Sequence, residues 1–179
     1  RLSDVGQVRQ LNEDSLLTIE IGRVRRSISE PLGLYAICDG MGGHSAGDVA
    51  SGLATQTLAR KALAEMMSDG IASDTQPNWE GWLKSAIQEA NQTIFGRRRA
   101  SGNNMGTTCV AALVHGDEAV IAHAGDSRCY LINDHGILQL TSDHSLVQRL
   151  VQMKQLTPEE ARTHPQRNVI YKNLGDKPT

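Results

Sequence analysis

The amino-acid sequence opens with short apolar segments that favour β-structure. Residues 15–21 are rich in β-branched and apolar side chains, and residues 34–38 form a continuous apolar run. Both segments are expected to be strands, the second one buried on both faces. Residues 40–47 contain four glycines and are expected to form a loop.

The pattern then changes from the period of a strand to that of a helix. A first stripe at helical spacing, which Gly70 ends, consists of Val49, Leu53, Ala54, Leu58, Ala62 and Met66. A second stripe, at steps of three and four, consists of Trp79, Trp82, Leu83, Ala86, Ile87, Ala90 and Ile94. These stripes predict two amphipathic helices. The basic run 97–99 is favoured at the end of the second helix by the helix dipole.

The second half of the chain returns to strands. Short apolar segments, separated by turn-forming residues, lie at 107–114, 119–124, 129–132 and 137–140. They predict an antiparallel meander. Residues 141–143 offer an N-cap for a short helix, and Thr157 followed by Pro158 begins another. The order of strands, two helices and more strands favours an α+β fold.

Composition excludes several function classes. The chain has 179 residues, of which 39% are hydrophobic, so we expect a single domain with a true core. A net charge of −2 and 3% aromatic residues argue against nucleic-acid binding. The apolar runs are far shorter than the roughly 20 residues of a membrane span, so we expect a cytoplasmic protein without a membrane partner. Cys38, Cys109 and Cys129 are expected to be buried thiols in a reducing compartment.

Carboxylates beside glycines at strand ends are the main chemical signal. Asp39 directly follows a predicted strand and precedes Gly40, where a backbone carbonyl could approach a hard cation such as Mg²⁺ or Mn²⁺. The alternative is a plain glycine-rich turn. Glu13 and Asp14 precede a strand and could equally form a solvated turn. Asp126 follows a strand, where an ordinary hairpin turn is the alternative.

Several separated motifs occur in the order of one known family. They are Asp4–Arg9 with Asn12–Asp14, Asp39–His44 with Ala46–Ser51, Gly106–Thr108, Ala124–Arg128 and Thr141–Ser145. With them, the sequence resembles the bacterial form of the metal-dependent Ser/Thr protein phosphatases of the PPM family, the protein phosphatase 2C type. The resemblance implies a four-layer α-β-β-α sandwich with two antiparallel sheets, incomplete at its C-terminal end. Residues 1–179 would be one catalytic domain whose C-terminal strands are missing.

The resemblance also implies a metal site. Asp39 would bridge two Mn²⁺ or Mg²⁺ ions, and the backbone carbonyl of Gly40 would bind one of them. Glu13 and Asp14 would hold metal-bound waters. Asp126 would help to bind a third ion, as in bacterial members.

Two further residues would act on the substrate. The resemblance implies that Arg9 clamps the substrate phosphate and that His44 protonates the leaving serine or threonine oxygen. A solvated surface arginine and a loop histidine are the respective alternatives. The reaction would be hydrolysis of phosphoserine and phosphothreonine in proteins by a water activated between the ions. The implied partners are phosphorylated proteins, opposite a Ser/Thr kinase, and the protein is expected to be a monomer.

Residues 143–170 resemble the flap of this family, a variable segment beside the active cleft. Its basic residues are Arg149, Lys154, Arg162 and Arg167. They could contact an acidic phosphopeptide or form a solvated helical face.

The sequence also departs from the family pattern. Complete members carry a second Asp-Gly motif and a late Asp-Asn motif after the flap, and neither occurs here; residues 171–175 also differ from the family pattern. Asp39 would therefore be the only carboxylate directly on the ions. Two hypotheses follow. The chain is part of an active phosphatase whose C-terminal piece is absent here, or it is a pseudophosphatase or phosphoprotein-binding module.

Overall fold

A computed structural model describes most of the chain. The described residues are 3–7, 10–25, 28–42, 46–66 and 78–178. The strands are β1 (Asp14–Arg25), β2 (Ile28–Met41), β3 (Gly106–Thr107), β4 (Cys109–His115), β5 (Glu118–Ala124), β6 (Tyr130–Asn133) and β7 (Gly136–Gln139). The helices are α1 (Ala46–Met66), α2 (Trp79–Ser101), α3 (Leu146–Gln152) and α4 (Pro158–Thr163).

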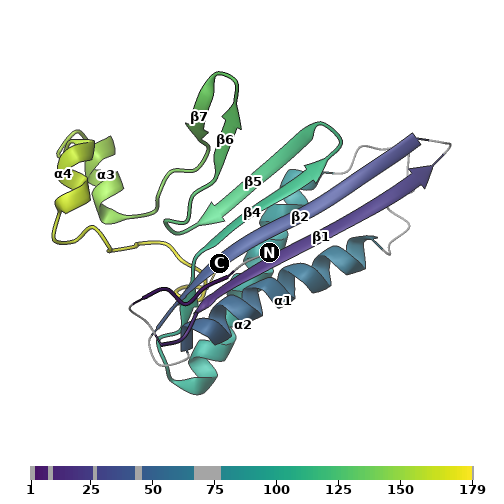
Figure 1. Ribbon diagram of the computed structural model, residues 1–179. Coiled ribbons are helices and arrows are strands. Elements are labelled where there is room, and N and C mark those ends of the chain that lie inside the picture. Colours follow the sequence, from purple (N-terminus) through teal and green to yellow (C-terminus); the bar gives the residue numbers. More distant parts are fainter. Residues whose placement is uncertain (1–2, 8–9, 26–27, 43–45, 67–77, 179) are drawn as a thin grey trace.

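Two antiparallel sheets organise the fold, which confirms the α+β class. The main sheet has the strand order β1-β2-β4-β5, and β3 pairs with the end of β2. Helices α1 and α2 pack against each other and against one face of this sheet (Figure 1). Strands β6 and β7 form a separate hairpin, which lies with α3 and α4 away from the two long helices (Figure 1).

The core lies between the main sheet and the two long helices. Its largest fully buried apolar side chains include Leu34, Leu58, Leu83, Ile94 and Met105. Small residues on α1 and α2 let the helices approach the sheet; the fully buried ones include Ala50, Ala54, Ala86 and Ala90. Both helical stripes are confirmed in outline, although Val49 is 38% exposed. Gly70, the expected end of the first helix, is outside the described residues.

Alternation along β2 decides which side chains face the helices. Leu34, Ala36 and Cys38 are buried, whereas Ile37 is 56% exposed and Asp39 lies on the same open face. The prediction that residues 34–38 are buried on both faces was therefore wrong within the described part of the chain. Cys38 is buried in the core, as expected, and it projects from the face opposite Asp39.

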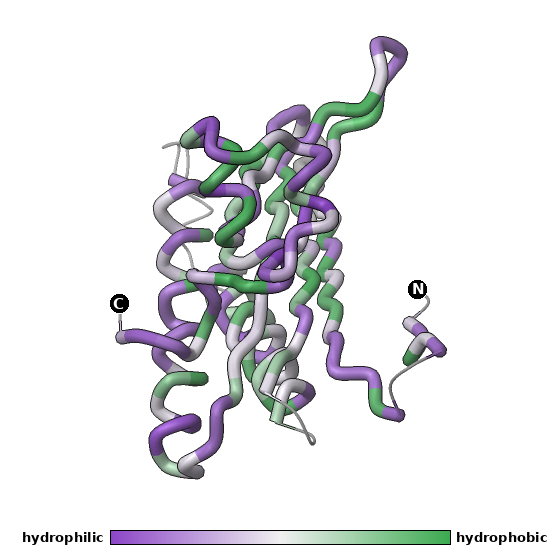
Figure 2. Tube along the Cα trace, turned by 90° about the vertical axis from the view of Figure 1, so that its left-hand side faces the viewer, coloured by the Kyte–Doolittle hydropathy of each residue, from purple (hydrophilic) through white to green (hydrophobic). Residues whose placement is uncertain are grey.

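The chain between β5 and β6 also differs from expectation. We expected a continuous meander, but β5 pairs with β4 while β6 pairs only with β7 in the described structure. The alternative of a hairpin turn at Asp126 is therefore wrong. Residues 125–129 instead carry the chain out of the main sheet. Figure 2 shows the β6–β7 hairpin projecting from the molecule, with apolar strands and a hydrophilic tip.

The ends of the short helices are fixed by side-chain caps. Ser145, and not one of residues 141–143, is the N-cap of α3, where its hydroxyl accepts the N–H of Gln148. The predicted start of α4 is confirmed. Thr157 and Glu160 form a reciprocal capping box, and Pro158 occupies the first turn.

Two expectations from composition concern cysteines and membranes. Cys38, Cys109 and Cys129 are all free thiols; the first two are buried as expected, but Cys129 is only partly buried, so the expectation was wrong for this residue. A hydrogen bond with Cys109, together with burial, raises the pKa of the Cys38 thiol. Among the described helices, none is long and apolar enough to cross a membrane.

Candidate metal and phosphate site

Two carboxylates face each other where β1 begins and β2 ends. Asp14 and Asp39 are register partners across this antiparallel pair. Side chains of directly opposite residues project from the same face of a sheet, with Cβ atoms about 5 Å apart. This is the open face, because Asp39 alternates with the buried Cys38. The register therefore brings together two acids that lie on separate motifs of the sequence.

Close backbone packing holds Glu13 beside this pair. The N–H of Gly40 donates to the carbonyl oxygen of Glu13 at 3.1 Å, and the buried hydroxyl of Ser51 donates to the same carbonyl at 2.7 Å. A Cβ on Gly40 would collide with the carbonyl oxygens of Gly47 and Glu13. One on Gly47 would lie 2.8 Å from Oε1 of Glu13. Gly40 and Gly47 thus let the start of α1 pack directly against the ends of β1 and β2. Gly40 itself belongs to β2, not to the loop expected from its glycines.

Thr108 connects Asp39 to the end of β5. Its hydroxyl accepts the N–H of Asp39 at 3.0 Å, and its own N–H donates to the carbonyl of Asp39 at 2.9 Å. The same hydroxyl shares a hydrogen bond of 2.7 Å with the hydroxyl of Ser127. A Cβ on Gly125 would lie 2.6 Å from Cγ2 of Thr108. The segment that carries Asp126 is therefore held at the same end of the sheet as Asp39.

His144 fixes the backbone on the other side of this segment. The ring Nδ1 of His144 accepts the backbone N–H of Gly125 at 3.1 Å, and the backbone N–H of His144 donates to the carbonyl of Gly125 at 2.9 Å. The ring stacks on His123 with centroids 4.6 Å apart. Burial, followed by the charges of Lys172 and His123, lowers the pKa of His144 to about 4. The neutral ring that accepts this hydrogen bond is thus the stable form near pH 7.

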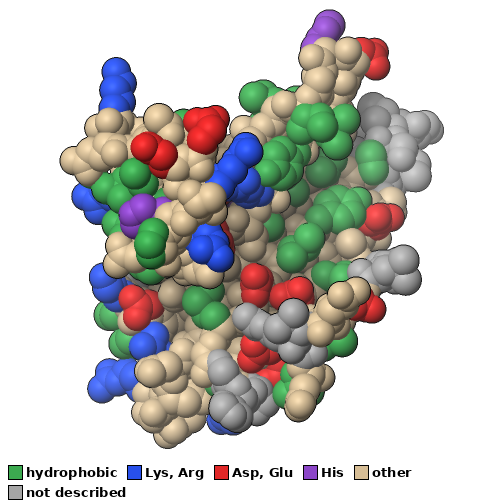
Figure 3. All heavy atoms as spheres, turned by 60° about the vertical axis from the view of Figure 1, so that its left-hand side comes forward, with side chains coloured by type: hydrophobic (Ala, Val, Ile, Leu, Met, Phe, Trp, Pro, Cys, Tyr) green, Lys and Arg blue, Asp and Glu red, His purple; other side chains and the backbone are tan. Residues whose placement is uncertain are grey.

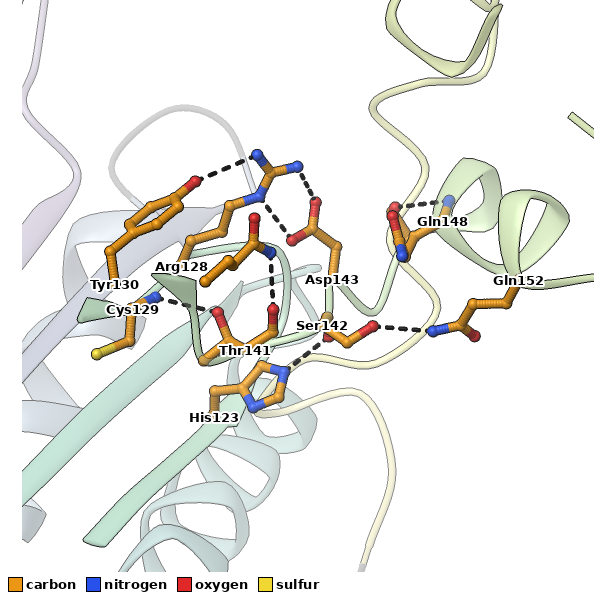
Figure 4. Close-up of polar contacts among 11 residues, drawn as sticks. His123, Arg128, Cys129, Tyr130, Thr141, Ser142, Asp143, Gln148 and Gln152 are labelled. Atoms are coloured by element: carbon orange, nitrogen blue, oxygen red, sulfur yellow. Dashed lines mark hydrogen bonds and ion pairs between the residues drawn. The ribbon is translucent and has the colours of Figure 1, made fainter. Parts of the chain in front are cut away.

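A bidentate ion pair lies next to Asp126. Nε of Arg128 donates to Oδ1 of Asp143 at 2.8 Å, and a terminal nitrogen donates to Oδ2 at 2.6 Å. Figure 4 shows both side chains pointing toward each other, with Tyr130 on the opposite side of the guanidinium. The hydrogen bond with Asp143 raises the pKa of the Arg128 guanidinium above its ordinary value. The side chain of Asp143 is only 10% exposed, so its charge is largely committed to this pair.

The predicted site residues fall into three groups. Glu13, Asp14, Asp39 and Gly40 lie together at the junction of β1, β2 and α1. Asp126 is tied to them through Thr108 and Ser127. Arg9 and His44 are outside the described residues.

The donor atoms at this junction suit a hard cation, but only in part. Facing carboxylates and a closely packed glycine are features that Mg²⁺ and Mn²⁺ sites use, because both ions prefer oxygen ligands. Within the described ranges, however, no group of three or more His, Cys, Asp or Glu side chains could hold an ion by itself. The described residues thus bring carboxylates together without assembling a complete set of metal ligands.

Sequence reasoning missed the residues that position the site. Thr108 was noted only as part of a small-residue strand start, and His144 only as part of a motif. Arg128 and Asp143 also lay within motifs, but nothing in their spacing indicated that they pair. The available signal for Thr108 was a polar residue near the start of the otherwise apolar segment 107–114, since such a residue needs hydrogen-bond partners if it is buried.

Residues 143–170, which the sequence predicts to be a flap, contain α3 and α4 and are tied together at their two ends. Ser145 and Ile170 form an isolated antiparallel bridge, and the N–H of Leu146 donates to the carbonyl of Val169 at 2.8 Å. The N–H of Tyr171 donates to the carbonyl of His144 at 2.9 Å. The ends of the segment are thus joined beside Gly125.

Comparison with known proteins agrees with these features. Residues 2–150 match the family profile described as "Protein phosphatase 2C". The chain is 38% identical over 175 residues to a curated protein of Listeria monocytogenes named serine/threonine phosphatase stp, covering 97% of this chain and 65% of that protein.

Solved structures give the same result. The structure of the serine/threonine phosphatase Stp1 from Staphylococcus aureus is similar with a TM-score of 0.79 and 40% identity, over 98% of this chain and 65% of that one. A catalytic domain of the phosphatase PstP, solved in complex with two manganese ions, has a TM-score of 0.73 and 33% identity, over 97% of this chain and 65% of that one. The chain therefore spans about two thirds of the length of these relatives. Sequence and structure together show that it belongs to the protein phosphatase 2C family.

Proposed function

We propose that this protein is a metal-dependent phosphatase that removes phosphate from phosphoserine and phosphothreonine in cytoplasmic proteins, opposite a Ser/Thr kinase. The observation that carries the proposal is the facing pair Asp14–Asp39, tied through Thr108 to the segment of Asp126. Family membership supports the same activity. We further propose that the protein acts as a monomer.

The residues at the junction would hold the ions. Asp39 would bridge two Mn²⁺ or Mg²⁺ ions, the carbonyl of Gly40 would bind one of them, and Asp126 would help to bind a third. Glu13 and Asp14 would orient the waters around them, as outer carboxylates commonly do. When bound, such ions supply a more acidic water and positive charge for the phosphate oxygens.

The remaining roles belong to residues on the substrate side. Arg9 would bind two oxygens of the phosphate, since a planar guanidinium matches that geometry. His44 would donate a proton to the leaving serine or threonine oxygen, which is a poor leaving group without one. Residues 143–170 would form the flap beside the substrate.

The alternative is a phosphoprotein-binding module without catalysis. The relatives of this chain are named phosphatases, which favours the enzyme. The retained combination of Glu13, Asp14, Asp39 and Asp126 in one region also favours it, because binding alone would not require this number of acids near a phosphate.

Hydrolysis by the full-length natural protein tests the proposal. Release of phosphate from an aryl phosphate and from a phosphothreonine peptide is measured with Mn²⁺, with Mg²⁺ and with a chelator. We expect metal-dependent turnover that Asp39→Asn abolishes. Asp117→Asn, an exposed acid in the turn between β4 and β5, is the matched control and should retain activity. Turnover that ignores the chelator, or peptide binding without any turnover, would refute the proposal.

A further inference from the structure

A polar groove runs between the segment of Asp126 and the two helices α3 and α4. Its volume is about 540 Å³, which is typical of ligand pockets. The residues that matter to its chemistry are Asp126, Arg128, Asp143, Gln148, Arg162 and Arg167. It thus begins at a proposed metal ligand and extends along the flap.

The charges in this groove are unevenly compensated. Arg128 and Asp143 neutralise each other through their bidentate pair. Arg162 and Arg167 form no ion pair with any of the described residues. Asp126 is the other acid in the lining, and bound divalent cations would offset its charge.

The acids on α4 do not compensate the arginines either. Glu160 is engaged in the capping box, where its Oε2 accepts the N–H and the hydroxyl of Thr157 at 2.8 and 3.0 Å. These bonds lower the pKa of Glu160. Glu159 is exposed in the first turn and forms no ion pair within the described structure. The groove therefore presents two arginines that have no anionic partner in the described structure and are available to bind one.

Figure 3 shows this side of the molecule. Basic (blue) and acidic (red) side chains both lie on the part of the surface formed by the two-helix segment, and further acidic side chains gather lower on the same face. A substrate whose phosphate lies near Asp39 would have its neighbouring residues close to the groove. Guanidinium groups bind carboxylates through paired hydrogen bonds, and the amide of Gln148 offers hydrogen bonds to a peptide backbone.

We infer that this groove is a specificity subsite for acidic side chains next to the phosphorylated residue, with Arg162 and Arg167 as its specificity-determining residues. The inference rests on the proposed function and names the class of substrate that the same site prefers. Acidic phosphopeptides gain two charge-assisted contacts here, whereas neutral ones gain none. Both contacts are exposed to solvent, so the preference weakens as salt is added.

Peptide pairs test the inference on the full-length protein. Each pair carries one phosphothreonine, flanked on both sides by glutamates in one peptide and by alanines in the other. The ratio of kcat/KM for the two peptides is measured for the wild type, Arg162→Gln, Arg167→Gln and the double variant. Arg149→Gln is the matched control, because Arg149 is an exposed flap arginine that does not line the groove. An aryl phosphate has no flanking residues, so its turnover measures the activity of the metal site without a contribution from the groove.

We expect the acidic peptide to be preferred, and each groove substitution to reduce the ratio about two- to five-fold, as exposed charge pairs do. Arg149→Gln should leave the ratio unchanged, and aryl phosphate turnover should be the same in all variants. Equal rates for both peptides in the wild type would overturn the inference, as would an equal loss in Arg149→Gln, which would indicate a diffuse charge effect. Absence of turnover on every substrate would instead overturn the proposed function, and the inference with it.

Discussion

The backbone N–H of Asp39 donates to the hydroxyl of Thr108 at 3.0 Å, and that hydroxyl lies 2.7 Å from the hydroxyl of Ser127. Thr108 is 1% exposed, so its side chain is buried. One buried side chain thereby connects β2 to the segment after β5. The relative position of two proposed metal ligands, Asp39 and Asp126, depends on it.

Replacement of Thr108 by valine should lower both stability and activity. The shape of the side chain is kept, but the partly buried N–H of Asp39 loses its side-chain partner, which costs about 1–3 kcal/mol. We expect this loss of unfolding free energy in urea titrations, together with weaker activation by Mn²⁺. Thr108→Ser keeps the hydroxyl and is the control for metal activation. If valine and serine variants respond equally to Mn²⁺, the connection through the hydroxyl does not position the ligands.

Substitution of Gly40 by alanine should destabilise the junction of β1, β2 and α1. The new methyl group would meet the carbonyl oxygens of Gly47 and Glu13, which are backbone atoms and cannot rotate away. A loss of about 1–3 kcal/mol is expected in the free energy of unfolding.

Gly52→Ala is the matched control for Gly40→Ala. Gly52 lies inside α1, and nothing lies within 4 Å of the Cβ position. Alanine there should stabilise the protein by about 0.5–1 kcal/mol, because it reduces the freedom of the unfolded chain and favours helix. Equal effects of the two substitutions on unfolding would contradict the packing observed at Gly40.

The facing carboxylates predict opposite effects of Asp14→Asn with and without metal. Like charges directly opposite each other destabilise a strand pair, so the variant should melt at a higher temperature than the wild type in a chelator. In Mn²⁺, the wild type should melt at the higher temperature, because a bound ion stabilises the native state. The variant should bind the ion more weakly, since outer carboxylates contribute about 10- to 100-fold to metal affinity. Thermal unfolding in both buffers measures this reversal. A variant that melts below the wild type in the chelator would exclude repulsion between the two acids.

The pKa of His144 predicts a pH dependence of stability. It is lowered from 6.5 to about 4 in the folded protein, so the unfolded chain binds a proton at this ring over the interval between these values, whereas the folded protein does not. The stabilisation by His144 is therefore complete above about pH 6.5 and is lost as the pH falls toward 4.

Urea titrations between pH 4 and pH 8 measure this effect. His144→Asn removes the titrating ring, so the slope of stability against pH should become smaller over this interval than in the wild type. His135→Asn is the control, because His135 is exposed in the turn between β6 and β7. An unchanged slope in His144→Asn would show that another group accounts for the acid sensitivity.

Local patterns in the sequence determined much of this protein. The apolar run 34–38 located β2 with its buried Cys38, and Thr157 followed by Pro158 identified the start of α4. Motif order identified the family and the acids to examine. These features depend on residues only a few positions apart, and the periods of helices and strands fix them directly.

Tertiary structure decided how the acids are assembled. The register of β1 against β2 placed Asp14 opposite Asp39, and Thr108, 69 residues after Asp39, fixed the segment of Asp126. The same packing took β6 out of the main sheet and turned His144 toward Gly125. Strand register and hydrogen bonds between distant segments depend on which core faces pack together, so no local period in the sequence specifies them.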